Sequence, residues 1–272
     1  MDRTGSDDAH PRTEISGPEV DVSTPNVARM YDYYLGGAAN FAVDREAAER
    51  ALAITPEIGR FARMNRLFLG RAVRYLCEQG IDQFLDLGSG VPTVGNVHEI
   101  AHQHDPDARV AYVDHESVAV AHARALLVGE PNVSVTQADI RRPADVLSAP
   151  GVSGLLDFSR PVAVLAVAIV HFVPDADDPA RILRTYREAC APGSYLALSH
   201  ASPITMTESE THRGQNVYRS TKTPLVVRDR DEIAGFLDGC ELVEPGLAPI
   251  NHWPTANDEQ PANGYGAVGK LR

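Results

Sequence analysis

The sequence predicts a Rossmann-like α/β fold, in which a mostly parallel sheet of seven strands carries helices on both faces. From residue 81 onward, short β-rich apolar runs alternate with helical stretches, the pattern of a parallel sheet wrapped by helices. The run at 161–168 is apolar at every position, which predicts a central strand covered on both sides. A glycine turn, Gly88-Ser89-Gly90, follows the first run, where open α/β sheets bind their ligands.

Each element of the predicted sheet follows from this alternation. The strands are expected at 82–87, 109–114, 133–137, 161–168, 194–199, 241–245 and 264–270. The helices between them are expected at 94–104, 116–127, 178–190 and 229–237. Residues 204–220 are expected to form either a substrate lid that carries Tyr218 or an ordinary surface helix, and residues 249–263 a loop around Trp253.

Three helices are expected ahead of the sheet. The first ends at the Gly36-Gly37 pair, the second begins near Asp44, and the third spans 56–79. Segment 25–45 concentrates aromatic side chains around the glycine pair, so it is expected to be a lid that orders over the ligand. A helical pair that is permanently docked on the sheet is the alternative.

The chain is expected to divide into three parts. Residues 1–22 are rich in Asp, Glu, Gly, Pro and Ser and hold few large apolar side chains, so they are expected to be a disordered tail. Residues 23–80 are expected to form an N-terminal helical lid or extension. Residues 81–272 are expected to form the ligand-binding domain.

The charge balance favours a small-molecule or protein substrate over nucleic acid, and of these a small molecule is expected. The formal net charge of −12 disfavours nucleic acid, whose phosphate backbone is bound by an excess of Lys and Arg. One basic cluster stands on the third helix opposite its apolar face, and it predicts either a solvated surface with local ion pairs or an anchor for a carboxylate. Its members are Arg60, Arg63, Arg66, Arg71 and Arg74.

Membrane, secreted and thiolate-metal proteins fit the sequence poorly. The longest apolar run, 161–170, is about half the length of a bilayer span, and the first residues lack the apolar stretch of a signal peptide, so a cytoplasmic location is expected. Cys77, Cys190 and Cys240 are odd in number and lack CxxC spacing, which disfavours a disulfide framework and a thiolate zinc site. The oligomeric state has no signature in the sequence.

The glycine turn after the first strand favours a nucleotide-type ligand. Gly88 and Gly90 let the backbone approach a ligand closely and turn tightly into the next helix. A dinucleotide site of the GxGxxG type needs a third glycine, and Pro92 and Thr93 follow here instead. A pyrophosphate ligand is therefore disfavoured.

Acidic residues end the second and third predicted strands. Asp114 is placed to accept hydrogen bonds from ribose hydroxyls, and Asp139 is placed to accept one from an adenine amino group. Carboxylates attract a cationic sulfonium and repel a pyrophosphate, so the set predicts a nucleoside ligand without phosphates. The alternative is that each Asp caps the helix that follows it.

These motifs resemble the class I methyltransferases that use S-adenosylmethionine (SAM), and more narrowly a largely actinobacterial S-adenosyl methyltransferase family once catalogued as a domain of unknown function. The resemblance spans residue 24 to the C-terminus and rests on PNVARMYDYYLGGAANFAVDREAAERAL, NRLFLGRAVRYL, FLDLGSGVPTVGNVHEIA, ARVAYVDHESVAVAHARALL and GYGAVGKLR. It implies transfer of a methyl group from SAM, with the N-terminal helices folded over the cofactor. It leaves the acceptor unspecified.

The expected cofactor site lies at the strand ends and under the N-terminal helices. Its expected residues are Tyr31, Tyr33, Asp86, Gly88, Ser89, Gly90, Asp114, His115, Asp139, Ile140 and Ala168. The acceptor is expected beside it, where His171 follows the fourth strand and is the first candidate for a base; shaping the pocket is its alternative role. His200, after the fifth strand, is the second candidate.

A rival motif runs from His98 to His102 and matches HExxH, in which two histidines bind zinc and Glu99 would act as a base. Its helix directly follows the glycine turn, and Asp105 stands where the extended zinc motif has glycine. We therefore expect no metal site, and zinc hydrolysis is a minor hypothesis. A SAM-binding sensor without turnover is a further hypothesis, as is a nicotinamide-dependent oxidoreductase, which the missing third glycine disfavours.

Overall fold

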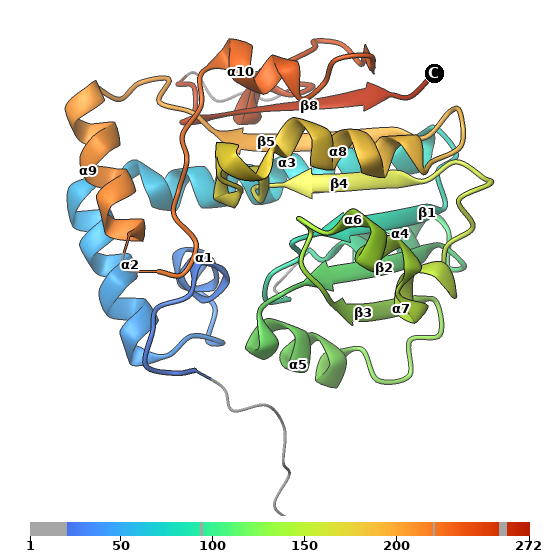
Figure 1. Cartoon of the computed structure of the whole chain (residues 1–272), viewed down its shortest axis with the longest axis horizontal. Helices are drawn as coiled ribbons and strands as arrows, with labels where there is room; N and C mark the ends of the chain where they lie inside the picture. The colour runs from blue at the N-terminus through green and yellow to red at the C-terminus, as the bar shows by residue number, and fades with distance from the viewer. Residues whose placement is uncertain (1–20, 93–94, 220, 256–259) are drawn as a thin grey trace, which may run out of the picture.

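The computed structural model describes residues 21–92, 95–219, 221–255 and 260–272. The predicted disordered tail, residues 1–22, lies outside the described residues except for its last two. Eight strands of the described chain form one sheet in the order β3-β2-β1-β4-β5-β8-β6, with β7 paired to β8 (Figure 1). The strands are β1 Gln83–Leu87, β2 Arg109–Asp114, β3 Val133–Gln137, β4 Ala163–Val167, β5 Tyr195–Ala201, β6 Glu241–Leu242, β7 Ala248–Pro249 and β8 Gly264–Lys270.

The sheet has the predicted, mostly parallel class. Strands β1 to β5 are parallel to one another, and β8 pairs antiparallel with β5, β6 and β7. The expected number of seven strands is wrong by one, because β7 has only two residues and shows no alternating pattern. The strand expected at 241–245 is shorter than predicted, since Pro245 has no N–H to donate to a ladder.

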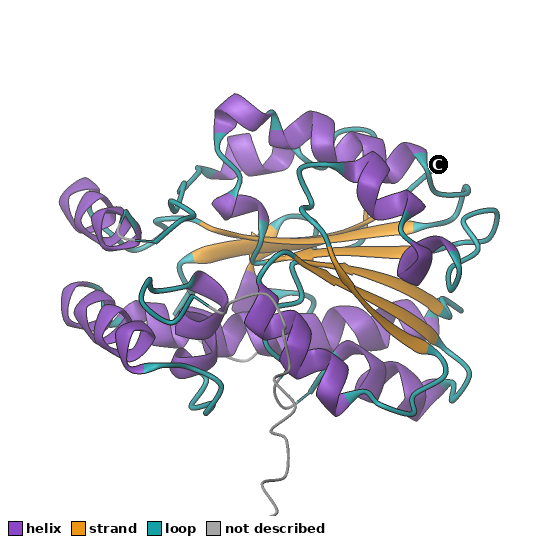
Figure 2. Ribbon diagram, turned by 60° about the horizontal axis from the view of Figure 1, so that its bottom comes forward, coloured by secondary structure: helices purple, strands orange, loops and turns teal. Residues whose placement is uncertain are grey.

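Helices cover both faces of the twisted sheet (Figure 2). Those of the described chain are α1 Val27–Tyr34, α2 Ala42–Ile54, α3 Glu57–Glu78, α4 Val97–His104, α5 Ser117–Leu126, α6 Pro143–Ser148, α7 Pro150–Ser153, α8 Pro179–Glu188, α9 Glu208–Tyr218 and α10 Arg230–Gly235, with 3-10 turns η1 Val170–Phe172, η2 Asp175–Asp177 and η3 Ile250–His252. The short helices α6 and α7 were not expected. None of the described helices combines the length and the apolar character that crossing a bilayer requires.

The central strand β4 explains the uninterrupted apolar run in the sequence. Val164 and Ala166 point to the face that α8 and α10 cover, and Ala163 and Leu165 point to the face that α3 and α4 cover. All four side chains are fully buried. Because both faces of β4 are covered, every position of the strand must be apolar.

The chain leaves β1 and β4 toward opposite faces of the sheet. Helix α4, after β1, packs on one face, and α8, after β4, packs on the other. A gap at the carboxyl ends of two such neighbouring strands is the usual ligand site of an open α/β sheet. Helices α1, α2 and α9 lie beyond this edge, with α9 beside α2 (Figure 1).

A buried ion network connects α1 and α2 to the part of the chain that forms the sheet. Arg29 on α1 donates to Asp44 of α2 at 2.8 Å, to Glu116 ahead of α5 at 3.1 Å, and to the carbonyl of Thr24 at 2.8 Å. The Arg29 side chain is 2% exposed and that of Asp44 is fully buried. Segment 25–45 is therefore docked in this structure, and its opening as a lid stays a prediction.

The arginine cluster on α3 is not a simple solvated face. Arg71 donates to the carbonyls of Ile250 and Trp253, and Arg60 donates to two further carbonyls of segment 249–263. The expected solvated face is therefore wrong for these two arginines. The reason is that the described residues of this segment form only a short 3-10 turn and the end of a two-residue strand, so side chains must satisfy their carbonyls. Trp253 is fully buried rather than standing in a surface loop.

We expect Arg29→Met to lower the free energy of unfolding by about 3–5 kcal/mol, because Asp44 and Glu116 would remain buried without their cation. Urea denaturation followed by circular dichroism measures this. Arg142→Met is the matched control, since Arg142 pairs with Asp145 on the surface at 75% exposure, and it should change stability by less than about 0.5 kcal/mol. Equal losses in both variants would contradict the anchoring role of Arg29.

Candidate functional site

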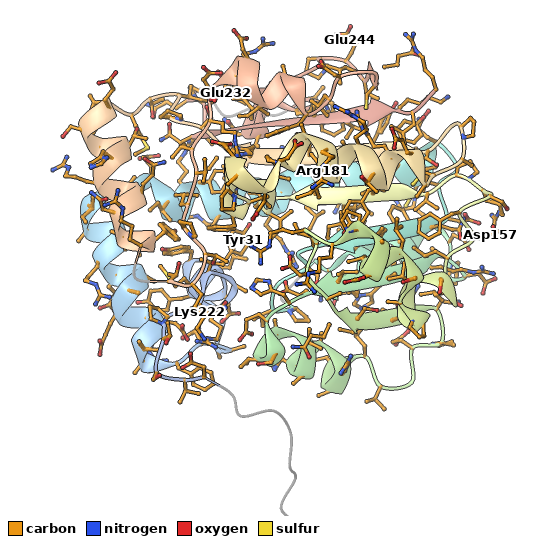
Figure 3. The ribbon with its side chains drawn as sticks, viewed as in Figure 1. Tyr31, Asp157, Arg181, Lys222, Glu232 and Glu244 are labelled. Atoms are coloured by element: carbon orange, nitrogen blue, oxygen red, sulfur yellow. The ribbon has the colours of Figure 1, made fainter. Side chains whose placement is uncertain are left out.

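A cavity opens at the carboxyl ends of β1, β2 and β4, under α1 and α3, and we call it the switch-point cavity. It encloses about 790 Å³ of empty space, its mouth included. Tyr31 belongs to α1, and its side chain lies on the side of this helix that faces the strand ends (Figure 3). The predicted residues that line the cavity are Tyr31, Asp86, Gly88, Ser89, Gly90, Asp114, His115 and Ala168.

The glycine turn shapes one wall of this cavity. Gly88 and Gly90 have φ angles of 71° and 66°, a region that side chains other than glycine rarely adopt. A Cβ atom on Gly88 would also overlap the side chain of Ile169, which follows β4. The turn thus brings the backbone close to the strand end, as a ligand-binding loop requires.

Asp114 holds the turn in place from the end of β2. Its carboxylate accepts from the N–H of Gly90 at 2.7 Å and from the N–H of Glu116 at 2.9 Å. The residue that caps α5 is Glu116, which accepts from the N–H of Ala119, so the alternative that Asp114 caps this helix is wrong. Each carboxylate oxygen has a second lone pair, which leaves acceptor capacity for ligand hydroxyls.

Asp86 places a second carboxylate in the cavity, at the end of β1. Burial raises the pKa of Asp86 to about 7, an effect that Arg66 opposes and Asp114 increases. Arg66 lines the same cavity from α3. The switch-point cavity therefore presents the carboxyl groups of Asp86, Asp114 and Glu116 and one guanidinium, and Glu116 is already paired with Arg29.

Three predicted residues lie outside the lining of this cavity. Asp139 and Ile140 stand at the same sheet edge, one strand further, where Asp139 binds Arg141 at 2.6 Å. Tyr33 donates to Glu49 on the outer side of the helix pair at 3.0 Å. Residues two apart on a helix do not share a face, so Tyr31 and Tyr33 cannot both reach the cavity.

A buried hydrogen-bond chain connects Tyr31 to the end of β4. Asn65 on α3 donates to the Tyr31 hydroxyl at 2.9 Å and accepts from the Ser199 hydroxyl at 2.5 Å. Ser199 in turn accepts from the N–H of Ala168 at 2.9 Å. Ala168 has a φ of 55°, and such strained backbone persists only where surrounding contacts hold it.

A second cavity, which we call the helix cavity, lies between α1, the start of α3, α9 and the end of β5. It encloses about 760 Å³ of empty space, its mouth included. Its wall is mostly apolar, and its aromatic residues are Tyr31, Tyr34, Phe61, Phe172 and Tyr218. Because Val27, Tyr31 and Phe172 line both cavities, the helix cavity adjoins the switch-point cavity.

His171 lines the helix cavity, whereas His200 lies behind it. Nδ1 of His171 accepts from the N–H of Ala201 at 3.2 Å, so the ring proton sits on Nε2. Burial lowers the pKa of His171 well below its usual value, which keeps the ring neutral. His200 accepts from Arg228 at 2.9 Å, and burial lowers its pKa to about 3. This arrangement favours His171 as a hydrogen-bond donor.

The segment that was expected to form a lid or a surface helix contains helix α9. Tyr218, the last residue of this helix, lines the helix cavity. The Tyr218 hydroxyl lies 3.1 Å from the hydroxyl of Tyr34 on α1, and burial raises the pKa of Tyr218 to about 12. After α9, Leu225 and Val227 also line the cavity, and the N–H of Val226 between them donates to the carbonyl of His171 at 2.8 Å. One side of α9 therefore forms part of the cavity wall, and its other side is exposed to solvent.

Sequence reasoning missed several polar residues in or beside the two cavities, among them Asn65, Arg66 and Arg228. Asn65 could have been predicted from the sequence, because it is a single amide on the apolar face of the third predicted helix. Arg66 was assigned only to the basic cluster. Arg228 had no signal, since it lies in an irregular segment, yet it is 3% exposed and donates to the carbonyl of Val173 at 2.8 Å.

The side chains of the HExxH motif all have structural partners. Nδ1 of His98 lies 2.7 Å from the Tyr112 hydroxyl, and Nε2 of His102 lies 3.0 Å from the carbonyl of Ala108. Glu99 accepts from the N–H of Asn96 at 2.8 Å as part of a capping box for α4. No group of three metal-binding side chains is present among the described residues.

Comparison with known proteins identifies a family for almost the whole chain. A family model described as S-adenosyl methyltransferase matches residues 13–271. No protein of a curated collection matches the chain. The family match includes both cavities and all the predicted site residues.

Two solved structures are similar over nearly their full length. A DUF574 family protein from Streptomyces avermitilis MA-4680 is 36% identical, with a TM-score of 0.88, and covers 93% of this chain and 100% of its own. A candidate methyltransferase from Thermobifida fusca YX is 38% identical, with a TM-score of 0.87, and covers 96% of this chain and 100% of its own. The N-methyltransferase NodS from Bradyrhizobium japonicum WM9, in complex with S-adenosyl-L-homocysteine, shares the fold at 14% identity, a TM-score of 0.51, and coverage of 89% and 98%.

We expect the purified chain to carry no stoichiometric zinc, because His98, Glu99 and His102 are occupied by protein partners. Elemental analysis after dialysis against a chelator measures the metal content, and the melting temperature should not change on dialysis. One zinc per chain that is lost in His102→Ala would contradict this expectation.

Proposed function

The chain belongs to the S-adenosyl methyltransferase family, and we propose on this premise that it methylates a small molecule held in the helix cavity. Its cofactor is SAM, and its fold is that of the class I methyltransferases. The observation that carries the proposal is the shared wall of Val27, Tyr31 and Phe172 between two cavities of different character. Ligands in the two cavities would meet at this wall.

The switch-point cavity fits SAM in its charges and in its backbone. The carboxylates of Asp86 and Asp114 suit the cationic groups and the ribose hydroxyls of the cofactor, and Arg66 suits its carboxylate. The turn around Gly88 allows the close approach that a nucleoside needs. The two acidic groups would repel the pyrophosphate of a dinucleotide, which supports SAM over a nicotinamide cofactor.

The helix cavity supports a role in acceptor binding. When bound, SAM would supply an electrophilic methyl group on its sulfonium. A nucleophilic atom of the acceptor would take the methyl group and release its proton to solvent, while the electrons of the broken carbon–sulfur bond stay on sulfur. The aromatic wall of the helix cavity excludes water from that contact. We propose that His171 positions the acceptor through its Nε2–H, since its Nδ1 is already occupied.

Turnover of SAM tests the proposed function directly. The full chain is incubated with SAM and a small-molecule extract of an actinobacterium, and the extract is examined by mass spectrometry. We expect S-adenosylhomocysteine to form together with one compound that gains the mass of a methylene group. Tight SAM binding without any turnover in such extracts would favour a sensor and contradict the proposal.

We expect Asp114→Ala to weaken SAM binding about 10- to 150-fold, the value of one charge-assisted hydrogen bond. Asp114→Asn keeps one acceptor oxygen and should lose less. Isothermal titration calorimetry measures both affinities. Asp145→Ala, an exposed carboxylate on α6, is the control and should bind SAM like the wild type. Unchanged affinity in Asp114→Ala would remove Asp114 from the site.

We retain the proposal that Asp139 accepts a hydrogen bond from the adenine amino group, although Arg141 also binds its carboxylate. Because Arg141 competes for the same oxygens, the loss in Asp139→Asn should be smaller, about 2- to 10-fold in SAM affinity. The same calorimetric titration measures it. A loss as large as that of Asp114→Ala would show that Arg141 moves away when the cofactor binds.

We expect SAM affinity to rise with pH between 5.5 and 7.5. The pKa of Asp86 is raised to about 7, so below that value its carboxyl is mostly neutral and cannot attract a cation. The affinity should therefore fall by up to about tenfold for each pH unit below 7. Asp86→Asn should lose this dependence, while His115→Asn, at the exposed rim, should keep it. A flat wild-type profile would contradict the role of Asp86.

A further inference from the structure

Two buried polar atoms on the wall of the helix cavity have no hydrogen-bond partner among the described residues. They are the hydroxyl oxygen of Thr55, just before α3, and the amide nitrogen of Asn263, just before β8. The two residues are only 6% and 8% exposed. Folded proteins rarely leave such groups unpaired, so a pair of them on one cavity wall indicates that a ligand completes their hydrogen bonds.

The orientation of the Asn263 amide is fixed by its neighbours. Its Oδ1 accepts from the N–H of Thr205 at 2.8 Å and from the Thr205 hydroxyl at 3.1 Å. A backbone N–H can only donate, so the atom it contacts must be the oxygen and the unpaired atom must be the NH2 group. Asn263 therefore requires an acceptor atom from the ligand, and the Thr55 hydroxyl can donate or accept.

The rest of the wall determines the other properties of the ligand. Aromatic side chains from α1, α3, η1 and α9 surround the cavity, and rings of this kind favour flat, apolar partners. Among the described lining residues Glu57 is the one with a carboxyl, ammonium or guanidinium group, and its side chain is exposed. His171 is neutral. A ligand with a buried charge would find no counterion here.

We propose that the acceptor substrate is an uncharged, flat aromatic compound with a carbonyl oxygen that accepts a hydrogen bond from Nδ2 of Asn263. The Thr55 hydroxyl supplies the second polar contact. This inference rests on the proposed function, because it names the acceptor class of the same site. Nucleotides and peptides are disfavoured, since both bring charges or many polar groups into an apolar cavity.

The experiment compares two bicyclic probes that differ at the carbonyl group. Chromone carries a ring carbonyl, and chromane has the same two rings without it. Each is titrated by calorimetry into the full chain saturated with S-adenosylhomocysteine. We expect chromone to bind about tenfold more tightly than chromane, the value of one buried hydrogen bond.

Two isosteric variants locate the contact. Asn263→Asp keeps the oxygen that Thr205 binds and replaces the donor by a second oxygen, so chromone should lose its advantage over chromane. Thr55→Val removes a hydroxyl without a protein partner, so it should weaken chromone while the melting temperature stays at the wild-type value or rises. Thr211→Val is the matched control, because that hydroxyl lines the same cavity but already donates to the carbonyl of Thr207 at 2.9 Å.

The outcomes separate this inference from the proposed function. Absent chromone binding, equal affinity for both probes, or an undiminished preference for chromone in Asn263→Asp would each overturn the acceptor class. A separate titration with S-adenosylhomocysteine alone tests the cofactor site, which neither variant residue lines. If S-adenosylhomocysteine does not bind in that titration, the proposed methyl transfer is contradicted. The affinities of chromone and chromane can then still be compared without cofactor.

Discussion

The buried guanidinium of Arg29 is the contact on which both cavities depend. Helix α1 contributes Val27 and Tyr31 to each cavity, and Arg29 holds this helix over the strand ends through Asp44 and Glu116. A buried ion network is stable only while every charge keeps its partner, because an unpaired charge in the interior is costly. The wall that the two cavities share is therefore as fixed as this network.

The two cavities differ in character, because one is lined by charged groups and the other mainly by aromatic rings. Carboxylates collect at the ends of β1 and β2, where parallel strands place Asp86 and Asp114 side by side, and they give one cavity its attraction for a cation. The other cavity has an aromatic wall with two unpaired polar atoms, so in our proposal it selects its ligand by shape and by hydrogen bonds. The hydrogen bonds from Tyr31 through Asn65 and Ser199 connect the shared wall to the strained backbone just after β4.

The sequence alone predicted the fold class, the family and the cofactor, and these predictions are confirmed. The fold class and the cofactor depend on local pattern, namely the alternation of strands and helices and the glycine turn at Gly88. The family depends on a resemblance over several motifs. Topology carries the pattern further, since the carboxyl ends of parallel strands meet at one edge. Asp114 therefore lines the cavity that its place at a strand end predicts. Tyr33 shows the limit of this reasoning, because aromatic content does not tell which side of a helix faces a ligand.

The tertiary structure alone decided which residues line the helix cavity. Thr55 and Asn263 are more than 200 residues apart in the sequence and meet on one wall because α3 and β8 pack together. The tautomer of His171 depends on the N–H of Ala201, and the role of Arg71 depends on the carbonyls near Trp253. Such contacts join side chains to distant backbone groups, and periodicity records only which face a residue is on, not which distant partner it meets.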